Sequence, residues 1–132
     1  MFSAVMMSGY AMADEARPAV ADKVMAYQSE QGIKVWTLRI GERSAHQALV
    51  QVEGIDHDWN MHIQKMNVEQ NARDTRYSTE VDGKKFVVLI LQNSWGELYL
   101  PGDNQERAVV YSENLSSQGN AQAFLTDYLE QK

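Results

Sequence analysis

The chain has no cysteine and only two prolines among its 132 residues. The lack of cysteine excludes disulfide bonds, thiolate zinc sites, iron–sulfur clusters and cysteine nucleophiles. Basic residues are also few, since 12 lysines and arginines face 18 aspartates and glutamates and the formal net charge is −6. Nucleic-acid binding normally needs a basic surface, so this charge balance argues against a nucleic-acid partner.

Motifs that mark nucleotide, calcium or hydrolase sites are missing as well. The sequence contains no Walker loop, no Gly-x-Gly-x-x-Gly, no EF-hand loop and no Gly-x-Ser-x-Gly. These absences favour a binding protein over an enzyme and call for no cofactor. A hydrolase whose catalytic groups meet only in the folded chain is an alternative.

The first residues have the pattern of a secretory signal. The stretch from Phe2 to Ala13 is uncharged and ends in Ala11-Met12-Ala13, although no lysine or arginine precedes it. It is shorter than the roughly 20 apolar residues that span a bilayer, so no transmembrane segment is expected. We therefore expect a signal-peptide-like segment at residues 1–13, one domain at residues 14–132, and a periplasmic or secreted protein.

Apolar spacing predicts a helix at each end of that domain. The first runs from Arg17-Pro18 to Gly32, and the second follows Asn120, which is suited to cap it. Between them, apolar residues alternate in short segments separated by turn residues. The sequence thus predicts an α+β fold, with a meandering antiparallel sheet of six or seven strands flanked by an N-terminal and a C-terminal helix.

The strongest local signal is a hairpin around Asp82-Gly83, a dipeptide suited to a type I′ turn. A two-residue loop fixes the register so that paired residue numbers sum to 165. The expected pairs are Glu80 with Lys85, Thr79 with Phe86, Tyr77 with Val88, and Arg76 with Leu89. Residues Phe86–Leu91 are apolar throughout, which predicts a central strand covered on both faces, by a second layer or by a homodimer.

One group of residues could hold a metal ion. Asp56, Asp58 and His62 would project to the same side of an extended segment, and carboxylate and imidazole are zinc ligands. The sequence therefore offers a metal-binding or small-ligand domain as an alternative function. The competing interpretation is a polar turn anchored by Trp59.

Charge and aromatic residues in the loops indicate a protein partner. From residue 97 onward, six acidic residues face two basic ones, which would attract a basic surface. Tryptophans in polar loops are typical interface anchors. We expect a small exported protein that works through protein–protein contacts, of the inhibitor or immunity type, with these binding residues: Trp59, Trp95, Asp103, Glu106 and Glu113.

Overall fold

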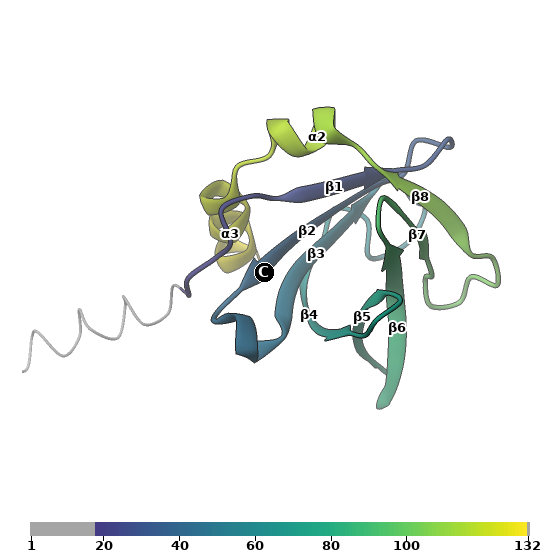
Figure 1. Ribbon diagram of the computed structural model, residues 1–132. Helices are drawn as coiled ribbons and strands as arrows, with labels where there is room; N and C mark the ends of the chain where they lie inside the picture. The colour runs from purple at the N-terminus through teal and green to yellow at the C-terminus, as the bar shows by residue number, and fades with distance from the viewer. Residues whose placement is uncertain (1–17, 132) are drawn as a thin grey trace, which may run out of the picture.

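A computed structural model describes residues 18–131 and shows a closed barrel of antiparallel strands (Figure 1). Each strand pairs with the next along the chain, and β8 pairs with β1 to close the barrel. The strands are β1 (Met25–Gln28), β2 (Lys34–Ile40), β3 (Gln47–Glu53), β4 (Ile63–Gln70), β5 (Thr75–Val81), β6 (Lys84–Gln92), β7 (Trp95–Leu98) and β8 (Arg107–Tyr111). A 3-10 turn, η1 (Arg43–Ala45), joins β2 to β3, and two helices, α2 (Glu113–Gln118) and α3 (Ala121–Glu130), follow β8. The signal-like segment at residues 1–13 lies outside the described residues.

The predicted α+β fold, an open sheet flanked by two helices, is wrong. The part of residues 17–32 that the structure describes contains β1 and an isolated bridge between Val20 and Ile40, where a helix was expected. The reason is that β1 is buried on both sides: Tyr27 belongs to the barrel core, whereas Ala26 lies under α2 and donates its N–H to Ser116 Oγ. A short strand buried on both faces has the apolar density of a helical stripe, so spacing alone does not separate the two.

Cross-strand pairing places one set of apolar side chains around the inner wall of the barrel. The pairs that carry this set from strand to strand are Tyr27–Val35, Val35–Val52, Ala48–Met66, Val68–Tyr77, Tyr77–Leu89, Leu89–Leu98 and Tyr27–Tyr111. Their side chains form a single cluster with Ile33, Val50, Val88, Leu91 and Val109. A barrel of this strand number is narrow enough for its side chains to fill it. Burial in this interior raises the pKa of Tyr27 to about 12.

The Asp82-Gly83 turn is confirmed, because both residues have positive φ, 54° and 80°. The predicted pairs of Glu80 with Lys85 and of Thr79 with Phe86 are confirmed as well. Beyond them the register shifts, so that Tyr77 pairs with Leu89 and Arg76 with Ile90, and the last two predicted pairs are wrong. A β-bulge at Val88 accounts for the shift of one residue.

This bulge also explains the apolar run of β6. Val88 and Leu89 are consecutive, yet both belong to the interior cluster, because a bulge can place two neighbouring side chains on the same side of a strand. The outward residues Val87 and Ile90 are only half-buried. Residues Phe86–Leu91 therefore do not form the centre of a sheet covered on both faces; the barrel is closed and has no central strand.

Helix α3 covers the outer side of the barrel over β2, β3 and β4. Its Leu125 packs in a second cluster with residues of the outward-facing set, among them Leu38, Leu49 and Ile63. The Asn120 side chain accepts a hydrogen bond from the Ala123 N–H, so the predicted C-terminal helix and its cap are confirmed. In Figure 1, α2 runs along β1 and α3 lies at the opposite end of the barrel from the β1–β2 turn and the β7–β8 loop.

Within residues 18–131, no helix has both the length and the apolar character that crossing a membrane requires.

The contact of α3 with the barrel predicts a clear difference between two leucines of this helix. Leu125 is fully buried and Leu129 is 42% exposed. Leu125→Ala should lower the free energy of unfolding by about 2–5 kcal/mol, because it removes buried methyl groups and leaves a cavity. Leu129→Ala should change it by about 0.5 kcal/mol at most. Urea unfolding measures both, and equal losses would show that α3 does not pack on the barrel as described.

Candidate functional site

The outward side of β7 and β8 forms an uncovered strip of six residues. Leu98 and Val109 belong to the interior cluster, so the residues that alternate with them along β7 and β8 point outward. The outward residues form two strand pairs, Trp95 with Val110 and Glu97 with Ala108, and just beyond the strand ends the side chain of Tyr99 bonds to that of Glu106. We call these six residues the β7–β8 face.

One end of the β7–β8 face is apolar and exposed. Trp95 is 44% exposed and Val110 is 54% exposed, although they are direct partners on adjacent strands. The neighbouring strand adds Ile90, which pairs with Glu97 and is half-buried. Helix α3 covers a different part of the wall, and α2 packs along β1. An exposed tryptophan beside further apolar side chains is typical of a binding surface.

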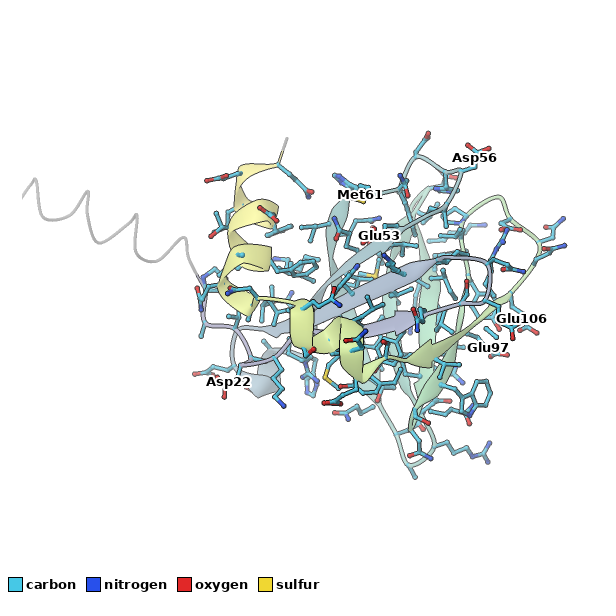
Figure 2. The ribbon with its side chains drawn as sticks, turned by 90° about the horizontal axis from the view of Figure 1, so that it is seen from above. Asp22, Glu53, Asp56, Met61, Glu97 and Glu106 are labelled. Carbon is cyan, nitrogen blue, oxygen red and sulfur yellow. The ribbon has the colours of Figure 1, made fainter. Side chains whose placement is uncertain are left out.

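The other end of the β7–β8 face is acidic. The Tyr99 hydroxyl donates to Glu106 Oε2 at 2.8 Å and also lies 3.3 Å from Glu97 Oε1. Within the described residues, neither glutamate forms an ion pair. The hydrogen bond to Glu106, helped by burial and by the charges of both glutamates, raises the pKa of Tyr99 to about 12. Figure 2 shows Glu97 and Glu106 close together, with Asp22 on the far side of the molecule.

A groove of about 530 Å³ adjoins this face. It lies between residues 28–31 of the β1–β2 turn and residues 105–108 at the start of β8, and Val110 also lines it. Glu30 and Glu106 contribute negative charge to its walls. Its one arginine, Arg107, is bound to Asp103 at 2.8 Å, and this contact is the main reason that the pKa of Asp103 is lowered. The groove is therefore acidic overall.

The loop between β3 and β4 closes the nearby end of the barrel. Trp59 packs against the interior cluster, with its ring edge-on to those of His57 and Phe86 at 5.5 and 6.3 Å. His57 Nδ1 accepts from the Trp59 N–H, so Nε2 is left to donate to the Pro101 carbonyl at 2.9 Å. The Nε2 bond thus joins the β3–β4 loop to the β7–β8 loop, whereas the Nδ1 bond lies within the β3–β4 loop. A second cavity, of about 450 Å³, lies between these two loops.

The structure does not bring the predicted metal ligands together. Among residues 18–131, no three histidine or acidic side chains are close enough to share a metal ion. Asp56, Asp58 and His62 therefore do not form a metal site. The expectation assumed an extended segment, but this loop turns: the Asn60 N–H donates to the His57 carbonyl, and the His62 N–H donates to that of Trp59. A turn removes the side-to-side alternation on which the predicted ligand set depended.

The predicted binding residues fall in different places. Trp95 and Glu106 belong to the β7–β8 face, and Asp103 lies beside it in the ion pair with Arg107. Glu113 is in the first turn of α2, where it accepts a hydrogen bond from the Tyr111 hydroxyl. Trp59 is half-buried at the end of the barrel and has a packing role.

Sequence reasoning missed Glu97, Tyr99 and Val110. The signal was present, because Trp95, Glu97 and Tyr99 recur at every second position and so share one side of a strand. Reading the same period through the following strand would have added Val110 to that side.

Comparisons of the chain with protein-family models, with curated proteins and with solved structures gave no match. The geometry of the described residues is therefore the basis for a functional proposal.

The acidic end of the face predicts a shift in the titration of Tyr99. Glu106→Gln removes the charge that favours the protonated phenol, so the pKa of Tyr99 should fall from about 12 toward its ordinary value of 10.0. In the unchanged protein this interaction should be fully present below pH 10 and be lost as the pH approaches 12. NMR of ring-labelled tyrosine measures the midpoint.

The matched control is Glu113→Gln, which removes a carboxylate bonded to a different tyrosine, Tyr111. It should leave the titration of Tyr99 unchanged. An equal fall in both variants would mean that net charge, rather than the contact with Glu106, sets the pKa.

Proposed function

We propose that this protein is a binding protein that holds a basic protein partner against its β7–β8 face. The observation that carries the proposal is the exposed pair of Trp95 and Val110 on the same strip as Glu97 and Glu106. An aromatic anchor beside charged groups matches the anatomy of protein interfaces, in which a few large side chains contribute most of the binding free energy.

The position of the apolar pair on paired strands supports this role. Trp95 pairs with both Gln92 and Val110, and Val110 also pairs with Gln28, so each backbone is fixed on two sides. Side chains on a fixed backbone lose less conformational entropy on binding than side chains on a free loop. The partner would therefore meet a preorganised surface.

The charges of the surface indicate the chemistry of the partner. The described residues offer Glu97 and Glu106 no cationic partner, and the nearby Arg107 is occupied by Asp103. Uncompensated carboxylates attract lysine and arginine side chains and raise the rate of association with a basic surface. The same charges repel phosphate polymers.

The signal-like segment at residues 1–13 supports a proposal about the location of the protein. It favours an exported protein that meets its partner in the periplasm or outside the cell, in the manner of an inhibitor or immunity protein that binds a secreted enzyme.

A cross-linking experiment identifies the partner and the face together. A photoreactive phenylalanine derivative at position 95 should capture a basic protein from the native envelope or medium. The same group at position 129, an exposed apolar position on α3, should not capture it. Capture of the same species from both positions would place the interface elsewhere.

The purified partner then allows a kinetic test with variants of equal net charge. Glu97→Lys combined with Glu106→Lys should lower the association rate at low salt by at least about tenfold. Asp22→Lys combined with Glu130→Lys makes the same change of net charge away from the β7–β8 face, because Asp22 lies on the far side of the molecule (Figure 2) and Glu130 ends α3, which packs over β2, β3 and β4. It should alter the rate by less than about twofold. Equal effects of the two double variants would contradict the proposed face.

A further inference from the structure

The pairing of β1 with β8, which closes the barrel and which we call the seam, is short. β1 and β8 pair at only two positions, Tyr27 with Tyr111 and Gln28 with Val110. Strand β8 begins earlier, at Arg107, so its first residues have no strand beside them on the β1 side. The groove of about 530 Å³ lies along this unpaired part of β8.

The pairing of β1 with β8 ends at Gln28, where the chain enters the β1–β2 turn. Ser29 closes the turn on itself: its N–H donates to the Ile33 carbonyl, and its Oγ accepts from the N–H groups of Gln31 and Ile33. Gly32, with φ of 91°, supplies the left-handed conformation that the turn needs. The turn is therefore held by its own hydrogen bonds and makes none to the main chain of β8.

Hydrogen-bond alternation shows which groups of β8 face the groove. The Ser112 N–H donates to Ala26 across the seam, whereas the Tyr111 N–H donates to Ser94 on the other side. In an antiparallel strand this direction alternates, so Val110 and Ala108 also turn their N–H and C=O groups toward the seam. Gln28 pairs with Val110, but the β1–β2 turn makes no main-chain hydrogen bond to Ala108, which is exposed.

We propose that the groove takes an extended segment of a basic protein, which adds to β8 as a short strand opposite Ala108. This inference rests on the proposed function and names the way in which the partner is held. An exposed strand edge is a template for pairing with another chain. Lysine or arginine side chains of the added segment would lie near Glu30 and Glu106, and the small side chain of Ala108 leaves room for them.

A defined peptide tests the inference directly. The probe is a capped hexapeptide of alternating lysine and valine, titrated into the protein while amide resonances are followed by NMR. Shifts are expected at Ala108 and at residues 30–32, with slower hydrogen exchange at Ala108. The same peptide with N-methyl groups on one edge should bind about tenfold more weakly, because it lacks the donors that pair with β8. A glutamate–valine peptide should not bind.

One variant tests strand addition, and a second tests charge attraction. Ala108→Pro removes the N–H that faces the groove, a change that an edge strand can accept because no barrel hydrogen bond uses that donor. It should abolish the peptide shifts at residues 30–32. If this variant does not fold, the N-methylated peptide tests strand addition in its place. Glu30→Lys on the exposed turn keeps the edge, tests charge attraction and should weaken peptide binding by at least about fivefold.

The experiments distinguish a failure of strand addition from a failure of the proposed function. Absence of any shift at millimolar peptide, or shifts at Thr79–Val81 on another strand, would overturn strand addition. Shifts confined to Trp95 and Ile90 that N-methylation does not affect would also overturn it. That last result would leave the β7–β8 face standing as the binding surface, whereas the association rates of the charge-reversed variants test that face independently.

Discussion

The pairing of β1 with β8 is the interaction on which the rest of this structure depends. It spans two residue pairs, and inside the barrel the rings of Tyr27 and Tyr111 meet edge-to-face at 5.6 Å. Closure gives every strand an inner and an outer side, and the inner sides share one apolar cluster. The same closure fixes β7 and β8 side by side, so that their outward residues form a continuous strip. Because the seam is short, it also leaves the first part of β8 beside an open groove.

The outer wall of the barrel is divided between packing and recognition. Helix α3 buries the outward side chains of β2, β3 and β4, and α2 lies along β1. The β7–β8 face has neither helix over it and keeps a tryptophan and a valine in water. The tyrosine and two glutamates at its other end hold negative charge in a defined geometry. Apolar anchor, fixed charge and free main-chain edge thus occur together on one side of the molecule.

Much of the local structure could be predicted from the sequence, whereas the closure could not. The Asp82-Gly83 turn and the Asn120 cap are decided by neighbouring residues, and both are confirmed. The closure depends on residues from the two ends of the strand series, and no local pattern encodes their pairing. β1 carries apolar residues on both sides and so imitates a helix. The bulge at Val88 removes the alternation that would have shown β6 to have one buried face.

For the site, composition pointed to Trp95 and Glu106, but only the strand register shows that Glu97, Tyr99 and Val110 share their side.

Amide hydrogen exchange along β8 tests the central claim most directly. A closed seam with a free edge predicts that Val110 and Ser112, which face β1, are protected together with Val109 and Tyr111, which face β7. Ala108 should exchange far faster than these four, at a rate close to that of an unstructured amide. Rapid exchange at Val110 and Ser112 would show that the barrel is open, and protection of Ala108 equal to that of Val110 would show that β1 covers the edge.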